Sequence, residues 1–591
     1  SDAATGARQI RLLGLSGAYV QMLTEQVPNL RGIASLYGLN YIPGPWMESI
    51  QVSKGTSSVK NGYEALTGQI NVEYKKPQTA DLLTVNLFGS HLGRLEVNTD
   101  ANFMLNDRLA TGILVHYSND LVSHDRNGDG FQDMPRTEQF NGMNRWYYKN
   151  ERFISQTAVN VIYETRESGQ DTHRAGENGS ERYRIGITTK RGVLYTKNGY
   201  ILNPETNRSV ALILSGSVHD QQSVFGHTSY DADQYNAYAS LLYEDEFSSR
   251  HRISAGVSFT YDRYEEKLDK ASFEGNGYPF SRTETVPGAF LQYTFNLDDR
   301  LVVLAGLRGD YHNRYGFFIT PRLHVKYDIT SFLTARLSAG KGYRTVNELA
   351  ENSFLLASSR QIAIDPQLNR FEGAWNYGAS LSSVIPLAGK DLSVGLEWYY
   401  TDFVRQVVTD LENAHEVRFY NLEGRSYAQT VQAEASYPFF RGFTLTAAYR
   451  YTDTKTDYRG LLREKPLTGK YKARATASYR TPLGKWQFDM TASFNGPGRL
   501  PDPDRSVAKI TDTWKTHYPA YALLNAQITR YFRNWSVYIG GENLTGYTQK
   551  NPIIGADDPW GRFFDASMIY APIHGAKFYA GIRWTLPKKN L

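Results

Sequence analysis

The chain has 591 residues, and its 65 Lys and Arg against 60 Asp and Glu leave a nearly balanced formal net charge of +5. It contains no cysteine, which excludes disulfide scaffolds, thiolate zinc sites and cysteine nucleophiles, and the balanced charge gives no case for a nucleic-acid partner. It nevertheless carries 42 Tyr, 28 Phe and 9 Trp at a mean hydropathy of −0.48. The fold must therefore accommodate many aromatic rings in a chain that is polar overall.

Residues 1–80 differ from the rest of the chain. Apolar and polar residues alternate only weakly there, glycine and proline are frequent, and the strand-like pieces are 9–13, 48–52 and 68–75. A segment this short does not easily build a core of its own. Only residues 75–78 separate it from the first strand expected near Leu82. We therefore expect residues 1–80 to fold inside the structure that follows.

From residue 81 onward the dominant pattern has a period of two. Runs such as 95–103, 471–479, 486–494 and 578–586 each present one apolar and one polar face. Several are about 9–11 residues long, which is the length that crosses a bilayer when tilted. Aromatic residues often stand at the ends of the runs, where a membrane barrel has its girdles. A large soluble β-sandwich or propeller also alternates, but a sandwich needs a second sheet over its apolar face.

The connections between the runs are of two kinds. Some are short and turn-like: 105–108, 297–300, 482–485 and 533–534. Others are long and polar: 119–144, 168–181, 221–234, 265–283, 347–370, 452–470 and 496–518. Short turns at one rim and long loops at the other are typical of outer-membrane barrels. We predict an all-β membrane protein, an antiparallel transmembrane β-barrel of about 22 strands, with a plug of residues 1–80 and a barrel of residues 81–591 with long extracellular loops.

One of the long connections has the spacing of a calcium loop. Asp125, Asn127, Asp129 and Asp133 place oxygen-bearing side chains at alternate or near-alternate positions, and Gly130 permits a tight turn. The loop is not an EF-hand, because an arginine stands where a bidentate glutamate is needed and no helical pattern flanks it. The alternative is an ordinary polar loop. Ca²⁺ in an extracellular loop is the one cofactor that we expect, and we find no catalytic constellation.

The end of the N-terminal region carries a family resemblance. An apolar strand at 48–52 leads to Lys54-Gly55, a small-residue turn, Gly62, and a Gly-Gln-Ile-Asn-Val sequence that begins at Gly68 and contains Asn71. This pattern resembles the end of the plug in the TonB-dependent outer-membrane receptors. Further segments resemble the same family: 28–32, 342–345, 365–368, 541–547 and 575–586. The resemblance thus spans the whole chain, and the plug motif is its specific part.

The resemblance implies TonB-dependent active import of a scarce metal chelate, such as a ferric siderophore or a corrinoid, across the outer membrane of a Gram-negative bacterium. The partners would be outer-membrane lipid, the TonB complex of the inner membrane and the chelate, and the protein would be a transporter and not an enzyme. In this family the TonB box and the first part of the plug lie upstream of these motifs, so we expect the chain to begin after them. A barrel of about 22 strands leaves a wide lumen, and such barrels are plugged.

The resemblance also suggests where the ligand lies, because the apex loops of the family's plug face the ligand. Aromatic and amide side chains suit a large, partly apolar chelate. The candidates are Tyr19, Gln21, Met22, Tyr37, Tyr41 and Trp46. For any one of them, packing against the barrel wall is the alternative interpretation.

Two other functions remain open from the sequence. A passive porin or sugar channel would have no plug, so the motif between residues 48 and 77 argues against it. A barrel that acts mainly as a surface adhesin, or as a platform for a ligand-capturing surface lipoprotein, would use the long loops more than the lumen.

Overall fold

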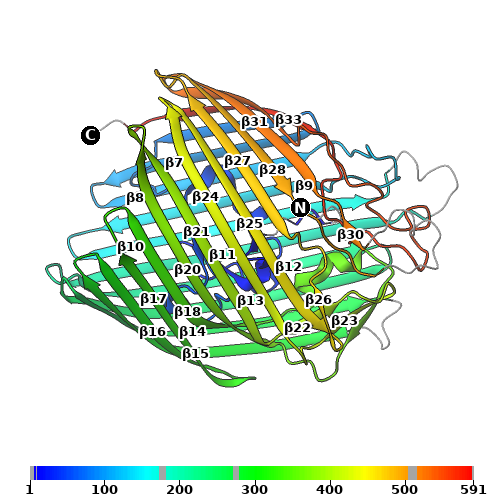
Figure 1. Ribbon diagram of the computed structural model, residues 1–591, viewed down its shortest axis with the longest axis horizontal. Coiled ribbons are helices and arrows are strands. Elements are labelled where there is room, and N and C mark those ends of the chain that lie inside the picture. Colours follow the sequence, from blue (N-terminus) through cyan, green and yellow to red (C-terminus); the bar gives the residue numbers. More distant parts are fainter. Residues whose placement is uncertain (1–4, 8–9, 172–180, 271–277, 503–515, 589–591) are drawn as a thin grey trace.

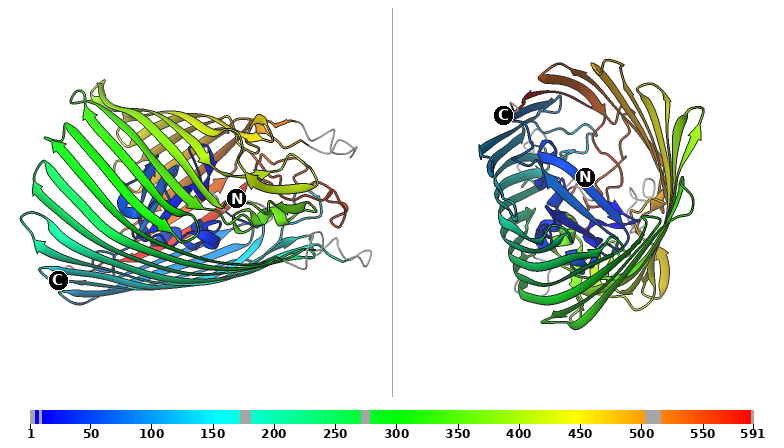
Figure 2. Two further views of the ribbon diagram at one scale, coloured as in Figure 1. Left: turned by 90° about the horizontal axis from the view of Figure 1, so that it is seen from below. Right: turned by 90° about the vertical axis from the view of Figure 1, so that its left-hand side faces the viewer.

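The computed structural model describes residues 5–7, 10–171, 181–270, 278–502 and 516–588. In this part of the chain, a closed barrel of 22 antiparallel strands surrounds a small N-terminal domain, and Figures 1 and 2 show the tilted strands and the enclosed domain in blue. None of the described helices is long and apolar enough to cross a membrane. The predicted fold class is confirmed.

The wall strands follow one another round the barrel in chain order, and β33 pairs with β6 to close it. The first half comprises β6 (Leu83–Ser90), β7 (Arg94–Asn106), β8 (Leu109–Asp120), β9 (Arg136–Lys149), β10 (Phe153–Gly169), β11 (Arg184–Asn203), β12 (Arg208–Phe225), β13 (Thr228–Ser248), β14 (His251–Asp269), β15 (Tyr278–Leu297) and β16 (Leu301–His312). The second half comprises β17 (Gly316–Asp328), β18 (Leu333–Thr345), β20 (Phe371–Leu387), β21 (Lys390–Arg405), β24 (Ser426–Phe440), β25 (Phe443–Tyr458), β27 (Tyr471–Arg480), β28 (Trp486–Asn495), β31 (Tyr521–Tyr531), β32 (Trp535–Glu542) and β33 (Lys577–Leu586).

Shorter strands belong to the loops. β26 (Leu461–Glu464) pairs with the end of β25. β19 (Gln361–Ile364), β22 (Val407–Asp410) and β23 (Glu416–Asn421) form a small sheet, and β29 (Gly498–Arg499) pairs with β30 (His517–Tyr518). All of them lie at one rim, on the right in Figure 1, while the strands at the other rim are joined by short turns. By the usual asymmetry of such barrels, the rim with the long loops is the extracellular one.

The exposure of wall residues follows the predicted alternation. On β28, Phe488 and Met490 are 39% and 49% exposed, whereas Asp489 and Thr491, which alternate with them, are half-buried on the inner face. On β33, Phe578 and Ile582 are exposed on the outer face, and Arg583 lies on the opposite face. On both strands the apolar face is therefore the outer one, which in a membrane barrel faces lipid.

Several strands are longer than the sequence predicted. β13 has 21 residues and β15 has 20, so most of 221–234 and part of 265–283, both predicted as loops, are strand. Residues 271–277 of that second stretch lie outside the described residues. Above the bilayer both faces of a strand can be polar, so the apolar alternation stops while backbone pairing continues. Sequence alternation therefore marked only the membrane-crossing part of these strands.

The domain in the lumen is built of short elements. They are β1 (Arg11–Leu12), β2 (Leu15–Ser16), η1 (Gly17–Tyr19), β3 (Val20–Thr24), η2 (Gly32–Ser35), η3 (Gly38–Tyr41), η4 (Gly44–Trp46), β4 (Met47–Lys54), η5 (Val59–Asn61) and β5 (Gly68–Tyr74). β5 lies between β3, which is parallel to it, and β4, which is antiparallel. β4 and β5 match predicted pieces. β3 was missed because all its residues are buried, so it has no alternation.

The motif that carried the family resemblance has local structural reasons. Gly55 has φ +76°, and a Cβ there would lie 2.9 Å from Asn376 Oδ1 of the wall. Gly68 has φ +157°, and a Cβ there would lie 2.4 Å from the Ser53 carbonyl oxygen. Asn71 accepts a hydrogen bond from the Gln26 N–H at 2.8 Å. The glycines permit close approaches that a side chain would block, and the asparagine fixes a turn.

Charged side chains fasten this plug to the wall. Arg31 lies 2.5 Å from Asp262 of β14 and 2.5 Å from Glu64 of the plug. Glu25 is fully buried and pairs with Arg145 of β9 at 2.8 Å. Burial alone would lower the pKa of Arg31, but the two carboxylates outweigh it and raise the pKa well above its usual value. The other plug–wall pairs are Lys54–Glu397, Lys60–Glu244, Lys75–Asp100 and Glu25–Lys197.

The pairs differ from those predicted. The alternation places Arg474 and Arg583 on lumen faces, so the sequence predicts partners for them on the plug, such as Glu48, Glu64 or Glu73. Neither arginine makes an ion pair with a described residue. Glu64 is taken by Arg31, and Glu73 lies 3.5 Å from Lys76 of its own segment. The prediction was wrong because Glu64 and Glu73 each have a nearer cation and Glu48 is exposed, which only the folded plug reveals.

The alternation predicts unequal tolerance of an added charge. Met490→Arg places a cation in lipid and should cost about 2–4 kcal/mol of unfolding free energy, whereas Thr491→Arg, on the lumen side, should cost far less. Urea unfolding in lipid vesicles measures both values. Equal tolerance at the two positions would contradict the barrel or its register.

The buried ion pairs predict that the plug loosens when Arg31 is lost. Arg31→Met leaves Asp262 buried without a cation, at a cost of about 3–5 kcal/mol, so hydrogen exchange at 28–36 should accelerate by about 100-fold or more. Exchange mass spectrometry of the detergent-purified protein measures it.

Lys60→Met is the matched control, because its partner Glu244 is 40% exposed and such pairs contribute little. Exchange at 28–36 that is as slow in Arg31→Met as in the control would show that the pair does not hold the plug.

Candidate functional site

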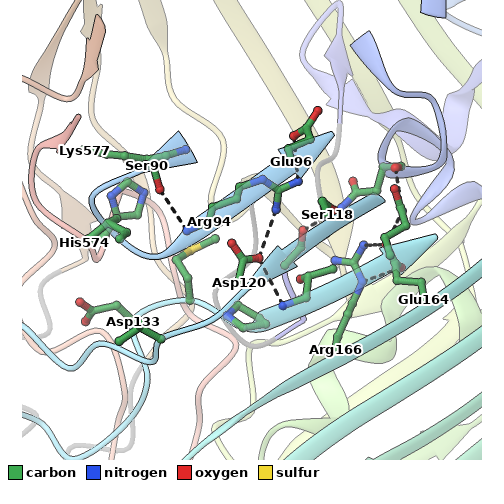
Figure 3. A pocket seen from close by; sticks show the side chains of 18 of the residues that line it. Ser90, Arg94, Glu96, Ser118, Asp120, Asp133, Glu164, Arg166, His574 and Lys577 are labelled. Atoms are coloured by element: carbon green, nitrogen blue, oxygen red, sulfur yellow. Dashed lines mark hydrogen bonds and ion pairs between the residues drawn. The ribbon is translucent and has the colours of Figure 1, made fainter. Parts of the chain in front are cut away.

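A polar cavity of about 210 Å³ lies between the plug and the wall on the long-loop side. The plug contributes Gly6 and the segment Leu39–Gly44, and the wall contributes the ends of β6–β10 near that rim. Loop residues such as Asp133 and His574 complete the lining, as Figure 3 shows. A ligand arriving from outside would meet the plug here.

The polar lining comes from alternate residues of neighbouring strands. Arg94 pairs with Asp120 at 3.1 Å, and Arg166 pairs with Glu164 at 2.8 Å. Gln139 donates to the Asn40 carbonyl oxygen of the plug at 3.0 Å and to Glu164 at 2.6 Å. Acidic and basic groups are thus balanced and linked to the plug. These residues were not singled out from the sequence, although their i, i+2 spacing on lumen faces was a usable signal.

Histidines also line this cavity. His116 contacts Asn98 Oδ1 at 2.9 Å, and His124 contacts the Leu92 carbonyl oxygen at 3.1 Å. Burial lowers the pKa of His574, which keeps its ring neutral at pH 7. No group of three or more His, Cys, Asp or Glu among the described residues is placed to hold a metal ion. The described lining therefore offers hydrogen bonds and charges to a ligand.

The predicted apex residues are packed inside the molecule. Tyr19, Gln21, Met22, Tyr37, Tyr41 and Trp46 are all 9% exposed or less. Their neighbours Leu39, Asn40, Ile42, Pro43 and Gly44 line the cavity instead. Met22 lines only a smaller cavity of about 30 Å³. A direct role of the six residues in ligand binding stays a prediction.

Tyr19 is an example of a predicted apex residue that instead connects the plug to the wall. Its hydroxyl donates to Glu372 of β20 at 3.3 Å and accepts from Gln406 at 2.9 Å, and Arg344 lies over its ring. Burial, with the Glu372 carboxylate, raises the pKa of Tyr19 well above its usual value. The phenol therefore stays neutral and ties the plug to the wall.

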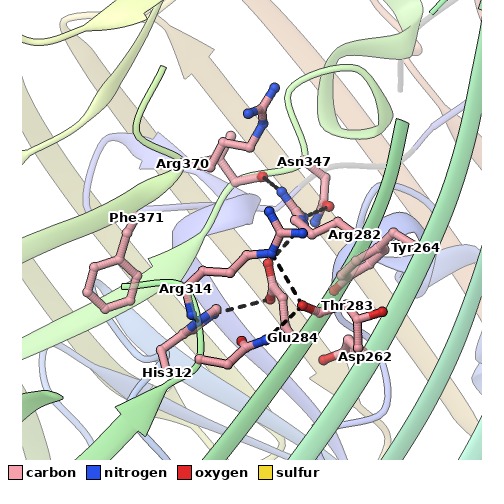
Figure 4. Close-up of polar contacts among 12 residues, drawn as sticks. Asp262, Tyr264, Arg282, Thr283, Glu284, His312, Arg314, Asn347, Arg370 and Phe371 are labelled. Atoms are coloured by element: carbon pink, nitrogen blue, oxygen red, sulfur yellow. Dashed lines mark hydrogen bonds and ion pairs between the residues drawn. The ribbon is translucent and has the colours of Figure 1, made fainter. Parts of the chain in front are cut away.

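The loop between β18 and β20 reaches the plug through a second polar network, drawn in Figure 4. Arg282 of β15 pairs with Glu284 at 2.9 Å, and it donates to Asn347 of the loop and to the Val346 carbonyl oxygen. The guanidinium of Arg282 lies 4.8 Å from the ring centroid of Tyr264. The Tyr264 ring packs so close to Gly32 of the plug that a Cβ there would lie 2.8 Å from its Cε1. The network thus joins loop, wall and plug.

The calcium-like loop is well ordered by its own backbone. Asp125 accepts hydrogen bonds from the Gly128 N–H at 2.7 Å and the Gly130 N–H at 2.9 Å, and both glycines have positive φ. Asp133 is 2% exposed, and its Oδ1 has no hydrogen-bond partner among the described residues. Burial, with repulsion from Asp125 and Asp129, raises the pKa of Asp133 to about 7. The loop thus brings three carboxylates close together, with Arg126 of the same loop partly offsetting their charge at Asp133.

The chain is similar to several proteins of known structure. The siderophore receptor PirA from Acinetobacter baumannii matches at 13% identity with a TM-score of 0.72, covering 99% of this chain and 93% of that one. A mutant of the ferric enterobactin receptor from Pseudomonas aeruginosa matches at 12% identity with a TM-score of 0.75, covering 99% and 94%. The copper transporter OprC matches at 14% identity with a TM-score of 0.74, covering 99% and 95%. At these identities the likeness shows the fold.

The family itself is shown by sequence. No curated protein sequence matches the chain. The family model described as "TonB dependent receptor-like, beta-barrel" matches residues 106–544, well over half of the chain. The chain therefore belongs to the family of TonB-dependent receptors.

Proposed function

We propose that this protein imports a scarce metal chelate, such as a ferric siderophore or a corrinoid, across the outer membrane of a Gram-negative bacterium, with energy delivered by TonB. The observation that carries the proposal is a plug held by ion pairs inside a closed barrel, with a polar cavity on its long-loop side. TonB-dependent receptors are transporters and not enzymes, and siderophore receptors and a copper transporter share this fold.

We further propose that residues 1–80 act as the gate and that residues 81–591 form the conduit. The plug–wall contacts include ion pairs and hydrogen bonds, which are directional and can be broken one at a time by a pull, beside apolar clusters that the plug and the wall share. A passive porin or sugar channel is disfavoured, because the lumen is occupied by the plug (Figure 2). A role as a surface platform for a ligand-capturing lipoprotein, which would use the long loops, is the second alternative.

Removal of the plug tests the gate. Deleting residues 1–80 should turn a closed protein into an ion-conducting pore, because a barrel of about 22 strands leaves a wide lumen. Planar-bilayer conductance measures the pore, and uptake of a radiolabelled ferric chelate by cells measures transport. The intact protein should be closed and should support TonB-dependent uptake. An intact protein that conducts like a porin, with conductance and uptake unchanged by the deletion, would refute the transporter assignment.

We also propose that the loop at 125–133 binds Ca²⁺ on the extracellular side. The alternate oxygens and the unpartnered Asp133 Oδ1 support it. Binding would draw together carboxylates that are not gathered around one point in the described structure. Calorimetry with CaCl₂ should show binding in the parent protein and its loss in Asp129→Ala.

The control for the calcium experiment is Asp107→Ala, which removes an exposed carboxylate from a turn at the opposite rim. It should bind calcium like the parent. No heat of binding in the parent, or no loss in Asp129→Ala, would return the segment to an ordinary loop.

A further inference from the structure

A second cavity lies on another flank of the plug. It has a volume of about 560 Å³ and is bounded by the β1–β2 hairpin of the plug and by lumen-facing residues of β24, β25, β27 and β28. Residues nearer the long-loop rim complete the lining: Leu467, Thr468, Gly469, Tyr518, Tyr521, Ile569 and Tyr570. It shares no lining residue with the cavity at Leu39–Gly44.

The lining of this cavity is strongly basic. Arg450, Lys472 and Arg474 project from the wall and Arg11 from the plug, against a single carboxylate, that of Glu434. None of these five groups forms an ion pair with another described residue. Arg11 instead donates to the Leu467 carbonyl oxygen.

The strand register explains why the wall cations lack partners. Arg450 stands directly opposite Lys472 on one side and Gln432 on the other. Arg474 stands opposite Ala448 and Ser493, neither of which is charged. Like charges directly opposite on neighbouring strands destabilise a sheet. This arrangement therefore has a cost that an anion in the cavity would offset.

Elsewhere the lumen is built differently. Three buried wall arginines stand two residues from a carboxylate on the same strand and pair with it: Arg166 with Glu164, Arg282 with Glu284, and Arg308 with Asp310. Two others, Arg191 and Arg322, donate to carbonyl oxygens of the plug. The strands β25 and β27 lack this device at Arg450, Lys472 and Arg474. Unlike Arg191 and Arg322, which are satisfied by the plug, these cations border open space, so the second cavity gathers positive charge.

Tyrosine side chains and a further cation lie at or near this cavity. Tyr518 and Tyr570 stack at 4.5 Å, and the Tyr521 hydroxyl donates to the Tyr570 carbonyl oxygen at 3.0 Å. Burial, with repulsion from Arg11 and Arg344, lowers the pKa of nearby Lys465 to about 8. Positive potential therefore extends from the cavity to the plug contact.

We propose that this cavity is a binding site for a multiply charged oxyanion, a ligand bearing several carboxylate, catecholate or phosphate oxygens. Arginine and lysine bind such oxygens through short, charge-assisted hydrogen bonds, and tyrosine hydroxyls can add neutral ones. Identifying the anion with the cargo rests on the proposed import function, and it means that the imported chelate is anionic and meets this site between plug and wall. The binding itself does not depend on transport.

The test is calorimetry on the detergent-purified full chain with citrate, ferric citrate and inorganic phosphate, and with a neutral ferric trihydroxamate as the uncharged probe. Arg450→Gln with Lys472→Gln should weaken binding of the anions by about 100-fold. Binding should also weaken as salt is raised. The neutral chelate should give no heat that depends on these two residues.

Arg583→Gln is the matched control, because it removes another lumen-facing cation that does not line this cavity. It should bind the anions like the parent, and Lys472→Arg should retain binding and show that the site tolerates substitution. Ferric citrate binding tighter than citrate and phosphate would identify a chelate as the ligand, and equal binding of phosphate would identify a free anion.

The proposal is overturned if no anion binds to the parent, or if Arg583→Gln weakens binding as much as the double variant. Uptake of a ferric chelate that fails in the parent while the anions still bind would count against the import function alone.

Discussion

The constraint on which this structure depends is that backbone polar groups in a bilayer must be paired within the protein. A closed ring of strands satisfies it, because every wall strand has a neighbour on both sides and β33 pairs with β6. Closure at 22 strands has a consequence, since the lumen is then wide enough to leak. The plug fills this wide lumen, and wall strands and loops contact it on several sides.

The plug is held by ion pairs and by apolar packing against the wall. Arg31, Glu25 and Lys75 each reach a charged partner on the wall, and glycines such as Gly55 let the backbone come close. Apolar side chains of the plug and the wall also pack into shared buried clusters, so the interface combines directional polar contacts with hydrophobic packing. Loops reach the same interface through the Arg282 network, so the outer surface and the plug are physically connected.

Much of the barrel could be predicted from the sequence, because alternation directly encodes the two faces of a strand. Met490 and Thr491 are an example, since their opposite exposures follow from their order in the chain. Strand ends were less predictable, because β13 continues where both faces are polar. Buried β3 showed no alternation, and so it was missed.

The candidate site was less accessible to sequence reasoning. Tyr37 and Trp46 have the chemistry of ligand contacts, yet they are buried, and Asn40 and Pro43 between them line the cavity. Which residue of a loop points outward depends on its backbone turn. Pairing across the lumen, as between Arg31 and Asp262, joins residues far apart in the chain and needs the fold.

The central claim is that the protein carries a metal chelate from the long-loop side toward the plug. Mass spectrometry with metal analysis of ligand that co-purifies with the protein from iron-limited outer membranes tests it most directly. The account predicts a metal-bearing, oxygen-rich chelate that dissociates at high salt. A bound sugar or other metal-free nutrient, or metal-free protein that also fails to bind any ferric chelate or corrinoid offered to it, would contradict the account.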